Sequence, residues 1–319
     1  MIIERRKNMK FPKCYIMIGL PGSGKDYFIN SNKKVNDIVV SSDKLREELF
    51  GDINDQKHNN EIFNEMFKRT VAALKNGQNI YYNATNINRK RRINLIKEIK
   101  NAVKKTVAFY AVVIATPYEK CLENNNKRDR KVPEEVIKKM LFNYQPPAYQ
   151  EGFNYIKFIR NYSFDIYLLL KKSQNISHRN PHHKLTIGDH MLKSAEYIKN
   201  YCDEYNLPFD YYMSNIYIAT KFHDIGKPMT QIQKDGICHY YNHHNVGAYI
   251  VSCSEVSNNN NTMALISNLI YHHMDYFDEN KIKKTKQFFH NDSIDYYDLN
   301  RPSFEWSLDL LHCADIYAH

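Results

Sequence analysis

The sequence predicts two domains of different fold class, an α/β domain with a parallel sheet followed by an all-α domain. With 319 residues the chain exceeds one typical domain, and its 43% apolar residues can fill ordinary cores. Apolar runs alternate with helical patterns up to residue 170, whereas nearly all later periodicity is helical. We expect a first domain over residues 1–172, a polar linker over 173–183 and a second domain over 184–319.

The first domain should contain five buried strands. Apolar, β-branched or aromatic runs of strand length occupy residues 15–18, 38–40, 80–82, 107–114 and 166–170. Helical periodicity lies between them, most clearly over residues 58–75 and 89–103. This alternation predicts a parallel sheet, which binds ligands at the carboxyl ends of its strands.

The second domain should consist of helices that direct polar residues inward. In a helix over about residues 187–202, His190 shares a stripe with apolar side chains. A helix near residues 214–225 directs His223 inward, and a last helix aligns Asp315 with leucines. These positions are candidates for a buried polar site.

Charge and cysteine content narrow the class of protein. The 45 Lys and Arg exceed the 35 Asp and Glu by 10, which favours an anionic partner, nucleic acid above membrane headgroups. The six cysteines form no CxxC pair, so neither a disulfide framework nor a zinc ribbon is indicated. Neither a signal peptide nor an apolar stretch of about 18 residues is visible. We expect a cytoplasmic protein, of a cell or of a virus-infected host, without a membrane partner.

A GxxxxGK motif over residues 19–25 predicts a phosphate site, because it follows an apolar run and precedes a helical stretch. Its backbone N–H groups surround phosphate oxygens, and Lys25 neutralises charge on the transferred group. The alternative is an ordinary glycine-rich turn. Asp26 stands where Ser or Thr usually contributes a hydroxyl to Mg²⁺, and a carboxylate binds such a cation directly or through water. The expected nucleotide contacts are Gly19, Gly22, Ser23, Gly24, Lys25 and Asp26.

A second polar site is expected where the second strand ends. Asp43 can accept a proton from a hydroxyl, and Arg46 can hold a neighbouring phosphate through two hydrogen bonds. An equally good interpretation is a helix N-cap followed by a solvated charge.

Over residues 11–170 the sequence resembles the phage-type polynucleotide 5′-hydroxyl kinases. The resemblance implies ATP and Mg²⁺ as cofactors, Asp43 as general base, Arg46 as a substrate phosphate contact, and Arg128 with Arg130 as a lid on the ATP phosphates. Without it, the basic run over 127–131 is a solvated segment. Asn83 stands where the family usually has Asp, and Asn124 where it often has Arg. The landmarks are the P-loop, Ser42-Asp43-Lys44-Leu45-Arg46, Asn83-Ala84-Thr85-Asn86, Arg128-Asp129-Arg130-Lys131-Val132-Pro133, Pro147 and Glu151-Gly152-Phe153.

Histidines concentrate after residue 178 and suggest a metal site. His223 and Asp224 are adjacent near a helix end, and imidazole with carboxylate suits Mn²⁺, Ni²⁺, Co²⁺, Fe or Zn²⁺. A single inward histidine such as His190 is more often a hydrogen-bonded core residue. The further candidates are His243, His244, His272, His273 and His312.

His190, His223-Asp224 and Asp315 occur in the order typical of the HD phosphohydrolase superfamily, which residues 184–319 resemble. Two imidazoles and two carboxylates buried without a cation would be costly, so we predict that they bind a divalent transition metal. The segment Tyr240 to Ala248 resembles a His-x-x-x-Gly-Ala element that selects His243 over His244, and His273 is preferred over His272. The alternative is that these histidines lie in exposed loops and bind no metal. Such a metal promotes hydrolysis of phosphoesters.

The combination resembles kinase and HD end-healing enzymes, which convert 5′-OH with 2′,3′-cyclic phosphate or 3′-phosphate ends into ligatable ends. It implies nucleic acid as partner, RNA above DNA because a cyclic phosphate needs the 2′ hydroxyl, and a separate ligase. Three alternatives remain: a small-nucleotide kinase joined to a nucleotidase, a kinase whose HD module only binds, and an ATP-operated regulator.

Overall fold

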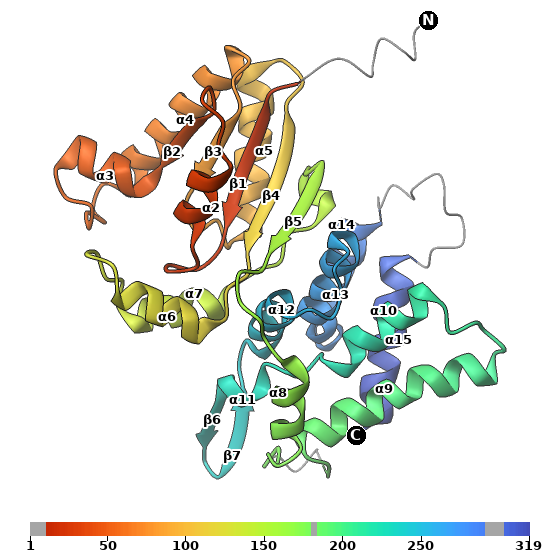
Figure 1. Ribbon diagram of the computed structural model, residues 1–319. Coiled ribbons are helices and arrows are strands. Elements are labelled where there is room, and N and C mark those ends of the chain that lie inside the picture. The colour runs from red at the N-terminus through yellow and green to blue at the C-terminus, as the bar shows by residue number, and fades with distance from the viewer. Residues whose placement is uncertain (1–10, 180–183, 291–302) are drawn as a thin grey trace, which may run out of the picture. The chain divides into compact units, whose positions relative to one another are not determined.

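The computed structural model describes residues 11–179, 184–290 and 303–319, which divide into two compact units. The first unit comprises described residues up to 133 together with 151–159, and the second comprises 134–150 with the described residues from 160 onward. A parallel sheet forms the first unit, and helices dominate the second (Figure 1). The predicted fold classes are confirmed.

The sheet of the first unit has the strand order β2-β3-β1-β4-β5, and every neighbouring pair is parallel. Four of the five predicted strands are confirmed. The fifth prediction, residues 166–170, is wrong: this run forms the helix α8, Ile166–Ser173, and the fifth strand is Tyr155–Ile159. The strands are β1 (Lys13–Ile18), β2 (Ile38–Ser41), β3 (Ile80–Asn83), β4 (Ala108–Ile114) and β5 (Tyr155–Ile159).

The carboxyl ends of three neighbouring strands carry the polar motifs of the first unit. The glycine-rich segment follows β1, Asp43 follows β2, and Asn83 ends β3. Since parallel strands end at one edge of a sheet, these motifs come together there. The helices of this unit are α2 (Lys25–Asn32), α3 (Ser42–Phe50), α4 (Asn59–Lys75), α5 (Arg89–Val103) and α6 (Tyr118–Asn126).

In the second unit, α9 and α15 pack on each other and on α10, and α12 packs on α13. The apolar stripe predicted for α9 is buried, with Ile187, Met191 and Ile198 fully covered. A short hairpin of β6 and β7 adds two strands to a domain predicted as all-α. The elements are α7 (Glu134–Phe142), α8, α9 (Ile187–Glu204), α10 (Tyr211–Lys221), α11 (Lys227–Thr230), β6 (Gln231–Lys234), β7 (Ile237–Tyr240), α12 (His243–Cys253), α13 (Asn260–His272), η2 (His273–Phe277), α14 (Glu279–Phe289) and α15 (Phe304–Tyr317).

Within the described parts of the chain, no helix combines the length and the apolar character needed to cross a membrane.

Candidate functional site

The glycine-rich segment forms a tight loop between β1 and α2. Gly22 and Gly24 adopt positive φ angles of 76° and 96°, which favour glycine. A Cβ on Gly22 would stand 2.2 Å from the carbonyl oxygen of Cys121, so no side chain fits there. The loop therefore brings backbone N–H groups to the N-terminus of α2, the arrangement that binds phosphate.

Lys25 folds back over this loop. Its Nζ donates hydrogen bonds to the carbonyl oxygens of Gly19 at 3.0 Å and Leu20 at 2.8 Å. Burial lowers the pKa of Lys25 to about 8. The ammonium is thus held where a phosphate on the loop would meet it.

Asp26 and Asn83 are in direct contact. Asn83, at the end of β3, is 5% exposed, and its Nδ2 donates to Oδ1 of Asp26 at 2.7 Å. Both positions depart from the usual kinase pattern, and the structure brings the two departures together.

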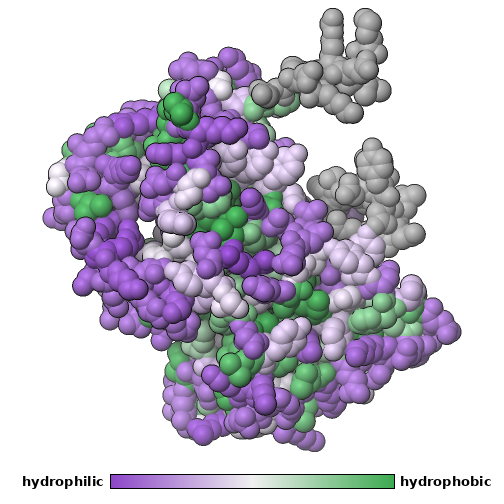
Figure 2. All heavy atoms as spheres, in the orientation of Figure 1, coloured by the Kyte–Doolittle hydropathy of each residue, from purple (hydrophilic) through white to green (hydrophobic). Residues whose placement is uncertain are grey.

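Asp43 lies among three arginines. Its carboxylate is 3.2 Å from Arg46, 2.5 Å from Arg130 and 3.7 Å from Arg128. Arg130 also donates Nε to Asn54 at 3.1 Å. Asp43 is not a helix N-cap, because Ser41 holds that position of α3. The predicted base, phosphate contact and lid residues therefore gather in one place, on a side of the unit where hydrophilic residues predominate over α3 and α6 (Figure 2).

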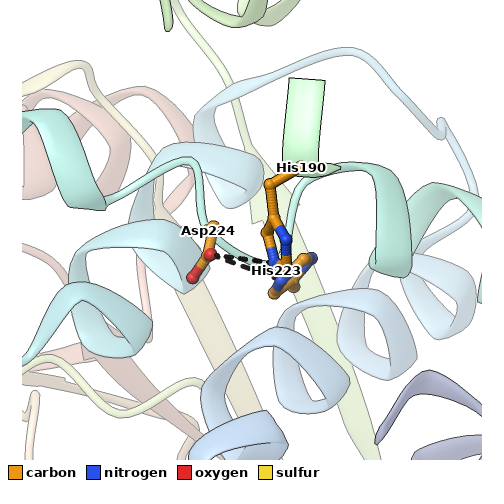
Figure 3. Close-up of side chains that lie close together, drawn as sticks. All are labelled: His190, His223 and Asp224. Atoms are coloured by element: carbon orange, nitrogen blue, oxygen red, sulfur yellow. Dashed lines mark ion pairs between the residues drawn. The ribbon is translucent and has the colours of Figure 1, made fainter. Parts of the chain in front are cut away.

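The six predicted metal ligands converge in the second unit. His190 comes from α9, His223 and Asp224 from the turn after α10, and Asp315 from α15. His243 begins α12 and His273 follows α13. None of the six is more than 5% exposed. Figure 3 shows His190, His223 and Asp224 directed toward one another.

Asp224 joins two groups of ligands. Its Oδ2 lies 3.4 Å from Nε2 of His223 and 3.6 Å from Nε2 of His190. Its Oδ1 lies 3.2 Å from Nε2 of His243 and 3.6 Å from Nε2 of His273. Oδ1 of Asp315 closes the first group, at 2.9 Å from His190 and 3.2 Å from His223. Two cations that share one carboxylate fit this geometry.

The ring orientation of three histidines also fits a metal site. The Nδ1 atoms of His223, His243 and His273 each lie 2.7 Å from a backbone carbonyl oxygen and must carry hydrogen. The other ring nitrogen, Nε2, then points into the cluster, where a cation that displaces its proton would bind. The Nε2 atoms of His243 and His273 lie 3.2 Å apart, close enough for one cation to bind both.

The charges of the cluster are strongly coupled. Burial disfavours a charge on His223, but Asp224 and Asp315 outweigh it and raise its pKa to about 10. Burial likewise opposes ionisation of Asp224, yet Lys227 and His223 hold its pKa well below the ordinary value. Nζ of Lys227 stands 2.6 Å from Oδ2 of Asp224. The site is thus a place where excess negative charge is balanced by cationic groups.

Two neighbouring histidines are not part of the potential ligand groups. His272 pairs with Asp275 at 2.5 Å, outside the ligand groups. Burial lowers the pKa of His244 to about 2, and its ring stacks at an angle on Tyr271. The preference for His243 and His273 therefore agrees with the geometry, while the role of each ligand stays a prediction.

Sequence reasoning missed His319. Its Nε2 lies 3.6 Å from Oδ1 of Asp315, and it forms a potential ligand group with His190 and Asp315. The available signal was its spacing of four residues from Asp315, although His319 lies just beyond the end of α15.

Comparison with known proteins gives two family matches. Residues 15–147 match the AAA domain, and residues 187–299 match the HD domain. Among solved structures, a chain of the Pnkp1/Rnl/Hen1 RNA repair complex is similar at 23% identity with a TM-score of 0.36, over 43% of this chain and 46% of that chain.

Two further structures share similarity. A fungal RNA kinase matches at 14% identity and a TM-score of 0.35, over 66% of this chain and 98% of that chain. A gluconokinase from Sinorhizobium meliloti 1021 matches at 13% identity and a TM-score of 0.28, over 44% of this chain and 79% of that chain. This chain spans less than half the length of the RNA repair chain.

Proposed function

Because this chain joins a P-loop kinase domain to an HD domain, we propose that it heals the ends of broken RNA. The kinase domain phosphorylates a 5′ hydroxyl with ATP, and the HD domain removes a 2′,3′-cyclic phosphate or a terminal 3′- or 2′-phosphate. The observation that supports the proposal is that the chain has two groups of residues suited to phosphate chemistry, the loop of residues 19–25 and the histidine–aspartate cluster around Asp224.

In the kinase reaction Asp43 accepts the proton of the attacking hydroxyl, and Arg46 holds a substrate phosphate. Lys25 balances charge on the transferred phosphoryl group. Arg128 and Arg130, which contact Asp43 here, are expected to contact the ATP phosphates when nucleotide is bound, and to stabilise the charge of the transition state. Their proximity to Asp43 supports a lid that closes over the reacting groups.

In the phosphohydrolase reaction, a divalent cation in the cluster supplies positive charge and lowers the pKa of bound water. Six residues, in the two groups that share Asp224, would provide the ligands for one or two such cations: His190, His223, Asp224, His243, His273 and Asp315. Lys227 keeps Asp224 ionised and fixes the orientation of its carboxylate. The carbonyl partners of His223, His243 and His273 keep each Nε2 directed inward.

The two proposed activities can occur in one protein because they act on different ends of the broken RNA. If both acted on the same 5′ end, one would undo the other. A 5′-OH and a 2′,3′-cyclic phosphate are the two ends of a single RNA break, and the cyclic phosphate requires a ribose 2′ hydroxyl. The net charge of +10 favours a polyanionic substrate. The product needs a separate ligase.

The test is incubation of an RNA that carries a 5′-OH and a 2′,3′-cyclic phosphate with the protein, ATP and Mn²⁺, followed by analysis of both ends. We expect a 5′-phosphate and a free 3′ end. A matched DNA with a 3′-phosphate measures the preference for RNA. Efficient phosphorylation of mononucleosides, weakly dependent on salt and without action on the RNA, would instead indicate a small-nucleotide kinase.

A further inference from the structure

Asp26 and Asn83 are in contact, and each carries the side-chain type that P-loop enzymes normally have at the position of the other. In such enzymes the residue after the lysine contributes a neutral hydroxyl to Mg²⁺, and a carboxylate comes from a neighbouring strand. Here the residue after Lys25 is the carboxylate Asp26, and the strand β3 ends in the neutral Asn83. One carboxylate and one neutral group are retained, in opposite positions.

We propose that Asp26 supplies the Mg²⁺ carboxylate of the kinase site and that Asn83 is the positioning residue that orients it. The inference rests on the proposed kinase function. In the proposed cation site, the carboxylate that binds Mg²⁺ comes from the end of the glycine-rich loop and not from the strand.

The geometry supports this assignment through the bond at 2.7 Å between Nδ2 of Asn83 and Oδ1 of Asp26. Asn83 is buried at the end of β3, so its amide is a fixed donor, whereas Asp26 is exposed at the start of α2. The amide engages one carboxylate oxygen, and the second oxygen remains for a hard cation, which prefers oxygen ligands.

Electrostatics explain why the two departures occur together. An aspartate at position 83 would place a second carboxylate at hydrogen-bonding distance from Asp26, where like charges repel strongly. An asparagine there removes the repulsion and adds a donor. Asp26 also stands beside the phosphate-binding loop, so without a cation it repels nucleotide phosphates. Metal ion and nucleotide binding should therefore be tightly coupled in this protein.

The experiment measures ADP affinity by calorimetry in the full-length protein, with and without Mg²⁺. In the native protein we expect Mg²⁺ to tighten ADP binding about tenfold or more. In Asp26→Asn we expect Mg²⁺ to have almost no effect and metal-free ADP to bind more tightly, because the repelling charge is gone. Lys25→Ala provides the baseline, which is the heat measured when ADP binds only weakly to the glycine-rich loop.

Exchange of the two side chains completes the test. Asn83→Asp alone should weaken metal-free ADP binding, whereas Asp26→Asn with Asn83→Asp restores one carboxylate and should recover most of the Mg²⁺ effect. Tight metal-free ADP binding by Asp26→Asn shows that its loop is folded, so the single variant suffices if the double variant is unstable.

An unchanged Mg²⁺ effect in Asp26→Asn would overturn the inference. Because the readout is nucleotide binding, it does not depend on the identity of the phosphate acceptor. The expected binding pattern in an enzyme that phosphorylates only mononucleosides would support the inference and contradict the proposed RNA substrate.

Discussion

Arg92 and Glu151 form a buried ion pair near the strand that leads into the glycine-rich loop. Nε and Nη2 of Arg92 each donate to the carboxylate at 2.7 Å, and both side chains are fully covered. Nη1 of Arg92 donates to the carbonyl oxygen of Asn86 at 2.9 Å, and Asn86 in turn donates to Met17 in β1 at 2.7 Å. The pair thereby fixes the segment next to the phosphate site.

We predict that Glu151→Ala destabilises the kinase unit by about 3–5 kcal/mol, because it leaves buried arginine charge without its partner. The matched control is Glu48→Ala, which removes an exposed carboxylate paired with Arg69 at 2.6 Å and should cost far less, because solvent screens the pair. Urea unfolding followed by a probe in the kinase unit measures both. Equal losses in the two variants would contradict the structural role of the buried pair.

At this scale, sequence reasoning identified residues by type and order but could not pair them. The candidate ligands were proposed because His190, His223-Asp224 and Asp315 occur in the order typical of HD phosphohydrolases, although His223 and Asp224 lie in the turn after α10 and not on the expected helical face. The partners Arg92 and Glu151 are 59 residues apart, and Asn83 and Asp26 are 57 apart. Neither pair has a local pattern, because each contact arises from the way strands and helices pack.

At the scale of the element, the helix α8 shows why the strand prediction for residues 166–170 was wrong. A short apolar run without alternation fits a buried strand and a helix equally well. The deciding signal was Asp165, whose side chain accepts a hydrogen bond from the backbone N–H of Leu168 and caps the helix. The true edge strand β5 alternates exposed Tyr155 and Lys157 with buried Ile156 and Phe158.

The turn after α10 depends on a close approach of two backbones. A Cβ on Gly226 would stand 2.1 Å from the carbonyl oxygen of His243 and 2.7 Å from the backbone nitrogen of Gly247. Only glycine lets the segment that carries Asp224 lie against the start of α12. The two ligand groups that share Asp224 therefore depend on this contact.

We predict that Gly226→Ala separates the turn from α12 and lowers the metal content of the purified protein severalfold, measured by plasma mass spectrometry. The control is Gly236→Ala in the β6–β7 hairpin, which has a positive φ of 79° but open space around its Cβ. This control should keep its metal despite backbone strain. Full metal content in Gly226→Ala would show that α12 tolerates the displacement.

At the scale of the whole molecule, the two compact units are not two consecutive stretches of the sequence. Residues 134–147 belong to the AAA match by sequence, yet α7 packs against α12 in the helical unit. Residues 160–172 also belong to the helical unit, while β5 completes the sheet of the other. Composition alone could not predict that these segments alternate between the two units. The linker at 173–183 stays a prediction.

Because the two proposed sites share no residue, single substitutions should separate the two activities. Lys25→Ala should lower ATP-dependent 5′ phosphorylation by about 10²-fold or more, since it removes preorganised charge at the phosphoryl group, and should leave phosphate removal intact. Asp224→Asn should do the reverse, because Asp224 belongs to both ligand groups. Both activities are read on the same RNA, and metal analysis checks that only Asp224→Asn loses its bound cation. Loss of both activities in either folded variant would mean that the two halves do not act as independent catalysts.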